Sequence, residues 1–201
     1  MSDKYSFLAP IYQPLSRVVF GKNLIEANTA FSTLGEGKRS LVIGGGDAVS
    51  YRDWGKSYSG EYWDTSQKMT DLAKENLNQS KVAVHTGQWP GEGKFDCVFL
   101  PFVLDTMPDQ EIEKLIDQIG NSLNAGGKVI LSDFFSPQTF YQKVIQRLMI
   151  SSFRVFVDHS RRDLPDFERL FHPAKWIIAD EKLWRKGWIR ARVYMLEDSA
   201  H

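Results

Sequence analysis

The chain alternates short apolar runs with segments whose apolar residues recur every three or four positions. Runs of β-branched and aromatic residues predict strands at 40–43, 60–64, 82–84, 95–100 and 129–132. Helical spacing of apolar residues predicts helices within the first 35 residues and at 66–77, 109–123 and 138–156. This alternation of strand and helix is typical of an α/β protein with a parallel sheet and right-handed crossovers.

Two aromatic-rich runs close the chain, at 176–183 and 188–196. The residues between them, 184–187, are too few for a crossover helix, so the two runs are predicted to form an antiparallel hairpin at one end of the sheet. Alternation within a hairpin predicts that its basic residues, between Lys182 and Arg192, face solvent. Because no repeat, low-complexity tract or linker interrupts the chain, we expect residues 1–201 to form one domain.

The composition is that of an ordinary globular protein. Of 201 residues, 42% are hydrophobic, and 25 Lys and Arg balance 25 Asp and Glu. The zero net charge argues against a nucleic-acid partner, because such proteins neutralise many phosphates. The longest apolar stretch, 97–104, is far shorter than the roughly 20 residues that span a bilayer, so no stable membrane insertion is expected.

The cysteine content indicates the cellular compartment, because disulfides form mainly in oxidising compartments. Cys97 is the single cysteine, so no disulfide can form within the chain, and no Cys or His cluster has the spacing of zinc ligands. The first ten residues lack the apolar segment of a signal peptide. These features predict a metal-free, cytoplasmic protein.

A strand that runs into a glycine loop carries the clearest chemical signal. Gly44, Gly45 and Gly46 directly follow the apolar run at 40–43, so the backbone can approach a ligand closely there. A helix after this loop would add its N-terminal amides. Asp64 lies at the tip of the next predicted strand, where a carboxylate can accept hydrogen bonds from both ribose hydroxyls. The pattern therefore predicts a ribose-containing ligand.

Four stretches of the chain resemble the class I S-adenosylmethionine-dependent methyltransferases. They are the glycine loop at 41–48, the ribose-acid motif at 62–69, the fourth-strand motif at 95–104 and the turn into the fifth strand at 123–131. Their order and spacing match the family, and so does the closing hairpin. The resemblance implies an α/β, Rossmann-like three-layer sandwich whose seven-stranded sheet is mostly parallel and ends in an antiparallel C-terminal strand.

The N-terminal residues extend this resemblance. Residues 5–12 are similar to the helical cap of the branch that methylates small molecules. A helical cap at 1–35 and a Rossmann-like core at 38–201 are therefore implied.

The resemblance also implies S-adenosylmethionine as cofactor and a small molecule as methyl acceptor. The implied cofactor contacts are Tyr12, Gly44, Gly45, Gly46, Asp64, Thr65, Gln88, Trp89 and Leu100. Tyr12 would close over the cofactor from the cap. Gln88 and Trp89 would border the adenine, and the backbone at Leu100 would meet the amino-acid end.

Two residues are candidates for catalysis. Methyl transfer mainly needs an aligned acceptor and exclusion of water, so the chemistry itself requires no catalytic side chain. A general base would help where the acceptor is a hydroxyl or a carbon acid. Asp105 follows the fourth predicted strand and His159 follows the long helix. Each also has an ordinary interpretation, as an exposed helix-entry carboxylate and as a surface histidine.

Departures from the family pattern keep two other functions open. Val42 stands where the family usually has an acid, and Ala48 stands where it has a third glycine. A non-catalytic binding protein with a degraded cofactor site is one alternative. A nicotinamide-dependent oxidoreductase would share the glycine loop and Asp64, although it normally has the third glycine. None of these patterns specifies an oligomeric state.

Overall fold

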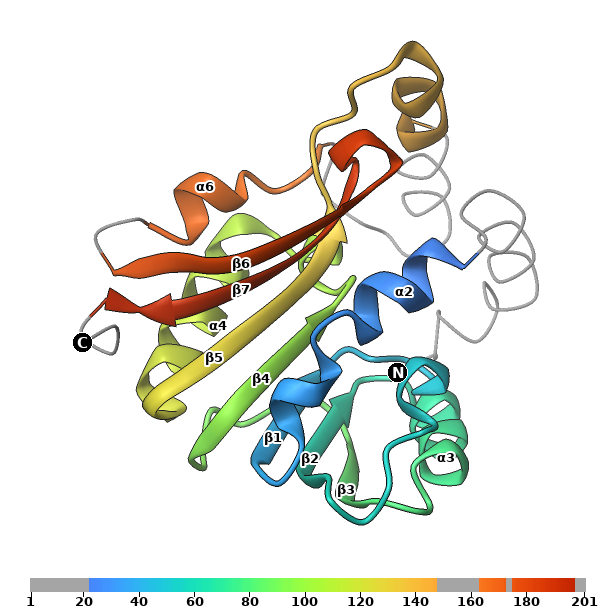
Figure 1. Ribbon diagram of the computed structural model, residues 1–201, viewed down its shortest axis with the longest axis vertical. Helices are drawn as coiled ribbons and strands as arrows, with labels where there is room; N and C mark the ends of the chain where they lie inside the picture. The colour runs from blue at the N-terminus through green and yellow to red at the C-terminus, as the bar shows by residue number, and fades with distance from the viewer. Residues whose placement is uncertain (1–21, 148–162, 173–174, 198–201) are drawn as a thin grey trace.

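The computed structural model describes residues 22–147, 163–172 and 175–197, which form an α/β sandwich around one sheet (Figure 1). The strands are β1 Arg39–Ile43, β2 Ser59–Asp64, β3 Lys81–Thr86, β4 Phe95–Pro101, β5 Leu123–Phe134, β6 Trp176–Trp184 and β7 Ile189–Leu196. Their order is β3-β2-β1-β4-β5-β7-β6. β1 to β5 pair in parallel, whereas β7 is antiparallel to both β5 and β6. The mostly parallel sheet and the closing hairpin are thus confirmed.

Helices cover both faces of the sheet. The α-helices are α2 Asn23–Thr29, α3 Gln67–Asn76, α4 Asp109–Ser122 and α6 Phe167–Leu170, and residues 140–147 are also helical. The 3₁₀ turns are η1 Ser32–Gly35, η2 Val49–Tyr51, η3 Leu104–Thr106 and η4 Arg185–Gly187. Figure 1 shows α2 in front of the sheet and α4 behind it. The adjacent residues Leu41 and Val42 of β1 belong to different apolar clusters, one on each face.

Local signals explain α3 and α4. The Ser66 hydroxyl accepts a hydrogen bond from the backbone N–H of Met69 and so caps α3, as the sequence predicts. The buried residues of α4 recur at helical spacing: Ile112, Leu115, Ile116 and Ile119. They face the cluster that contains Leu41, which explains why α4 packs on that face.

The helix expected after the glycine loop is absent, and that prediction is wrong. Only the short turn η2 lies there, preceded by Ala48 at φ 58°. The Trp54 ring stacks on Tyr58 with centroids 4.6 Å apart, and it packs edge-on against Phe99 at 5.4 Å. These rings fill the face of the sheet that a crossover helix would cover. Within the described ranges, no α-helix therefore directs its N-terminal amides at the glycine loop.

The closing hairpin also differs from the prediction, because Arg192 does not face solvent. Its side chain is 4% exposed and forms ion pairs with Glu181 and Glu168. The guanidinium also lies 4.5 Å from the centre of the Phe135 ring. Since α6 carries Glu168 over this face of the hairpin, alternation along the strand does not leave the face open to water.

Candidate functional site

The residues singled out by the sequence lie at the carboxyl edge of the parallel strands. The chain runs from β1 outward to β2 and β3, then returns to the other side of β1 as β4. In open α/β sheets, ligands bind beyond the carboxyl ends of the strands where the strand order reverses in this way. Three segments border that point, and we call residues 44–46, 64–66 and 102–106 together the switch-point site.

Gly44 and Gly46 of the loop lie in different surroundings. Gly44 and Gly46 adopt φ values of +70° and +64°, a conformation that is costly for residues with a Cβ. A Cβ on Gly44 would lie 2.2 Å from Cγ2 of Val103, so only glycine lets the segment after β4 pack against the loop. A Cβ on Gly46 would have no neighbour within 4 Å. Gly46 therefore faces open space from which a ligand can approach the backbone.

Asp64 is tied directly to this loop. Its Oδ2 accepts a hydrogen bond from the Gly46 N–H at 2.9 Å, and its Oδ1 accepts one from the Ser66 N–H at 2.9 Å. A carboxylate has about four acceptor positions, so ligand hydroxyls can join the two backbone donors. The half-buried carboxylate thus lies beside the open side of Gly46, where a bound ribose would need it.

Tyr62 supports the loop from within the core, a role that sequence reasoning missed. The side chain is fully buried, and its hydroxyl donates to the Gly46 carbonyl oxygen at 3.1 Å. A Cβ on Gly45 would lie 2.2 Å from the same hydroxyl. Burial, and then the charge of Asp64, raise the pKa of Tyr62 well above its usual value, so the phenol remains a donor.

Replacing Tyr62 by phenylalanine is expected to lower the free energy of unfolding by about 1 kcal/mol, because the Gly46 carbonyl loses its buried donor. Chemical denaturation measures this change. Tyr58→Phe is the matched control, since the Tyr58 ring stacks on Trp54 but is not part of the loop. Equal losses in both variants would contradict the role assigned to the Tyr62 hydroxyl.

The other predicted cofactor contacts take different positions. Leu100 is fully buried in β4, and its backbone lies just before the segment that contacts Gly44. Thr65 is exposed directly after Asp64. Gln88 is exposed, two residues beyond the end of β3. Tyr12 lies outside the described residues, and of the predicted cap only α2 and η1 lie within them.

Trp89 belongs to the core. Its side chain is 7% exposed, packs against Phe95 with ring centroids 6.2 Å apart and donates its indole N–H to the Glu92 carbonyl at 3.1 Å. β3 and β4 are joined by residues 87–94 without a helix, and the Trp89 ring fills part of the space that a helix would take.

A comparison with protein families decides what kind of protein this is. The model of a family described as a methyltransferase domain matches residues 22–179, well over half of the chain. The chain belongs to the methyltransferase-domain family. This match confirms the methyltransferase family that the four motifs predict.

Solved structures share the fold of this methyltransferase. An O-methyltransferase family 2 protein from Planctomyces limnophilus, in complex with apigenin, is 16% identical with a TM-score of 0.69, covering 96% of this chain and 62% of that one. The mitomycin 7-O-methyltransferase is 15% identical with a TM-score of 0.66, covering 91% and 58%. A TehB-like S-adenosylmethionine-dependent methyltransferase from Corynebacterium glutamicum is 13% identical with a TM-score of 0.57, covering 96% and 98%.

These likenesses establish the fold. The chain spans about three fifths of the length of the first two proteins. A sequence search among curated proteins found no match.

The candidate catalytic residue Asp105 lies in η3 of the methyltransferase, and it is half-buried. The structure adds a second acid, Asp133 in β5, which is completely buried. Burial, and then the charge of Asp105, raise the pKa of Asp133 well above its usual value. Sequence reasoning missed Asp133 because one acid inside an apolar strand has no distinctive spacing. His159 lies outside the described residues.

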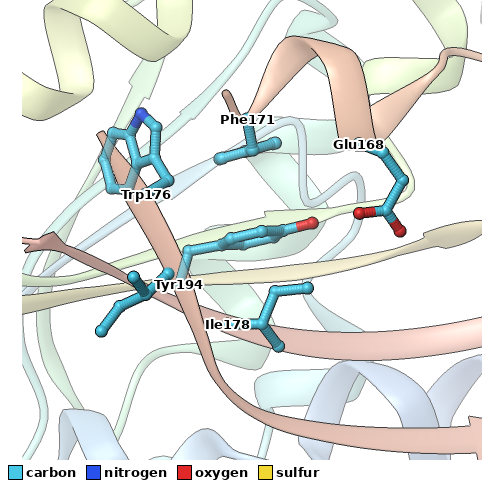
Figure 2. Close-up of a pocket in the computed structure, with 6 residues that line it drawn as sticks. Glu168, Phe171, Trp176, Ile178 and Tyr194 are labelled. Atoms are coloured by element: carbon cyan, nitrogen blue, oxygen red, sulfur yellow. The ribbon is translucent and has the colours of Figure 1, made fainter. Parts of the chain in front are cut away.

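A small pocket of about 220 Å³ lies elsewhere on the methyltransferase, between α6 and the closing hairpin (Figure 2). Its lining residues are Glu168, Phe171, Trp176, Ile177, Ile178 and Tyr194. Figure 2 shows the Tyr194 ring beneath Phe171, and the two rings stack with centroids 4.1 Å apart. β7, which carries Tyr194, is three strands away from β1. The pocket is therefore distinct from the switch-point site.

Within residues 22–147, 163–172 and 175–197, no three His, Cys, Asp or Glu side chains gather in a way that could hold a metal ion. Over the same ranges, no helix combines the length and apolar character needed to cross a membrane.

Proposed function

We propose that this methyltransferase binds S-adenosylmethionine at the switch-point site and methylates a hydroxyl group of a small, planar acceptor. One observation carries the proposal. Gly46 presents its backbone to open space, and the Asp64 carboxylate is fixed beside it by two backbone amides. The residues present thus fit the close backbone approach and the ribose contact that the cofactor needs.

Each part of the cofactor has proposed partners. The backbone of the glycine loop and of Leu100 would meet the methionine part, and Asp64 with Thr65 would hold the ribose. The Gln88 side chain would meet the adenine edge, because an amide offers both a donor and an acceptor. The buried ring of Trp89 would fix the segment that carries Gln88, and Tyr12 would close the site from the cap.

The chain's contribution to the reaction would be alignment, exclusion of water and proton acceptance. When bound, S-adenosylmethionine supplies a methyl group on a positively charged sulfur. Asp105 lies two residues beyond Val103, which contacts Gly44, so it is near the loop that would hold the cofactor. We assign to Asp105 the proton that the acceptor hydroxyl loses as its oxygen gains the methyl group. His159 is the second candidate for this role.

Two of the structures that share the fold are named O-methyltransferases, and one of them holds apigenin. These names favour a hydroxylated aromatic acceptor. The proposal therefore includes a small-molecule substrate and no nucleic acid. It places the reaction in the cytoplasm, where the lone buried thiol of Cys97 stays reduced.

The test is methyl transfer to a panel of hydroxylated aromatic compounds that includes apigenin. The protein is incubated with S-adenosylmethionine carrying an isotopic methyl group, and products are identified by mass spectrometry. Asp105→Asn is expected to slow transfer by about 100-fold, as loss of a general base does. Asp117→Asn, at an exposed position on α4, is the matched control. Cofactor binding without methylation of any compound would favour the non-catalytic alternative.

The oxidoreductase alternative is disfavoured by the backbone after the glycine loop. A dinucleotide pyrophosphate is held by the N-terminus of the helix that follows the loop. In this chain only the turn η2 follows it, and Ala48 stands where the third glycine would be. We therefore expect no reduced nicotinamide cofactor to bind.

A further inference from the structure

The carboxyl group of Asp133 lies close enough to Asp105 of the switch-point site for the two charges to interact. Asp133 is the second-last residue of β5 and is 0% exposed. Asp105, in the turn after β4, is the charged residue whose proximity perturbs it. The two acids come from the ends of neighbouring parallel strands, so the fold itself brings them together.

Burial disfavours a full negative charge on Asp133, although backbone N–H groups face its carboxyl. Its Oδ1 accepts the N–H of Phe134 at 2.7 Å, and the carboxyl also faces the backbone N–H groups of Leu104 and Asp105. Its Oδ2 is buried without a hydrogen-bond partner among the described residues. A second charge close to a buried carboxylate favours the protonated form. Burial and the charge of Asp105 therefore both favour a protonated Asp133.

The nearest basic residue on the adjoining strand is already engaged. Arg190 in β7 pairs opposite Asp133 in the sheet. Its guanidinium donates to the Gly187 carbonyl at 2.8 Å and to Glu181 at 3.3 Å. Arg190 thus shares Glu181 with Arg192, and Asp105 rather than Arg190 is the charged residue that perturbs Asp133.

The turn that carries Asp105 connects this pair with the glycine loop. Phe102 adopts φ +50° and donates its N–H to the Ser132 carbonyl at 2.7 Å, which fixes the start of the turn on β5. The next residue, Val103, packs against Gly44. The pair therefore forms part of the wall against which a cofactor in the switch-point site would lie.

We propose that Asp105 and Asp133 share one proton, that the pair would release this proton to solvent when a positively charged methyl donor binds, and that the ionised pair would then accept the proton of the methyl acceptor. This inference rests on the proposed function. A neighbouring positive charge favours ionised carboxylates, and two coupled acids titrate as one unit. The proton leaves to solvent when the donor binds, and the acceptor hydroxyl replaces it when the methyl group is transferred. Each turnover thus releases one proton.

The pairing is tested without any substrate, by measuring unfolding temperature against pH. A group whose pKa is raised on folding costs stability as pH rises through its folded value. Asp133→Asn cannot ionise, so its unfolding temperature should exceed that of wild type by about 3 °C or more once the pH rises above about 5. Asp105→Asn should also raise the unfolding temperature. The increase in the double variant should be smaller than the sum of the increases in the two single variants. The pairing would be overturned if the unfolding temperatures of Asp133→Asn and wild type ran parallel with pH. It would also be overturned if the double variant gained the sum of the two single-variant increases.

The response to the cofactor is tested by calorimetry in two buffers of different ionisation enthalpy. Wild type should release up to about one proton on binding S-adenosylmethionine and close to none on binding S-adenosylhomocysteine, which lacks the sulfonium charge. Asp133→Asn should lose this difference, whereas the control Asp117→Asn should keep it. Equal release with both ligands, or release retained in Asp133→Asn, would overturn the inference. If wild type binds neither ligand, the proposed function fails, and the unfolding series still decides whether the acids are paired.

Discussion

Replacing Asp64 by alanine is expected to weaken the binding of S-adenosylhomocysteine by about 100-fold. The variant loses the acceptor for the ribose hydroxyls, and hydrogen bonds to a charged group contribute roughly 1.5–3 kcal/mol each. It also removes the acceptor that fixes the N–H groups of Gly46 and Ser66. A loss of about 3 kcal/mol corresponds to the stated change in affinity, which isothermal titration calorimetry measures directly.

Asp53→Ala is the matched control for this prediction. Asp53 is exposed in the segment between η2 and β2, so the control makes the same change in charge without altering the loop. It should bind as wild type does. Asp64→Asn should fall between the two, because its amide keeps one acceptor oxygen. An affinity of Asp64→Ala within about threefold of wild type, a difference below 1 kcal/mol, would contradict the ribose contact.

Replacing Gly44 by alanine is expected to lower the free energy of unfolding by about 3 kcal/mol. The positive φ alone costs about 1–2 kcal/mol for a residue with a Cβ. The new methyl group would also collide with Val103, whose Cγ2 lies 2.2 Å from the Cβ position, and overpacking typically adds 1–3 kcal/mol. Denaturant-induced unfolding measures the loss.

Gly46→Ala is the natural comparison for Gly44→Ala. It has the same backbone strain, but a Cβ there has no neighbour within 4 Å, so it should cost about 1 kcal/mol. Its methyl group would instead occupy the open side of the loop and weaken S-adenosylhomocysteine binding. In the double variant Gly44→Ala with Val103→Ala, the shorter side chain at position 103 removes the clash. This double variant should therefore recover part of the lost stability. Equal losses in the two single variants would show that the Val103 contact does not matter.

Much of the fold follows from signals that are local in the sequence. The glycine loop after β1, the cap of α3 at Ser66 and the four-residue connection of the closing hairpin each depend on neighbouring residues. The position of Asp64 follows from the spacing of β1 and β2. These features could therefore be predicted, and the structure places Asp64 on the loop as the motif requires.

The features that were missed depend on which element covers which face. Periodicity does not reveal that Trp54 and its neighbouring rings replace the first crossover helix, because aromatic residues suit loops and helices alike when they are buried. The burial of Arg192 follows from α6, which is distant in the sequence. The proximity of Asp133 to Asp105 requires the register of β4 and β5. Each is a tertiary effect that overrides the local pattern.

The most direct test of the central claim is amide hydrogen exchange with and without saturating S-adenosylhomocysteine. If the methyl donor occupies the switch-point site, exchange should slow at residues 44–46, 64–66 and 102–106. Exchange around the pocket between α6 and the hairpin should stay unchanged. Protection confined to that pocket, or unchanged exchange at residues 44–46 under saturating ligand, would contradict the account.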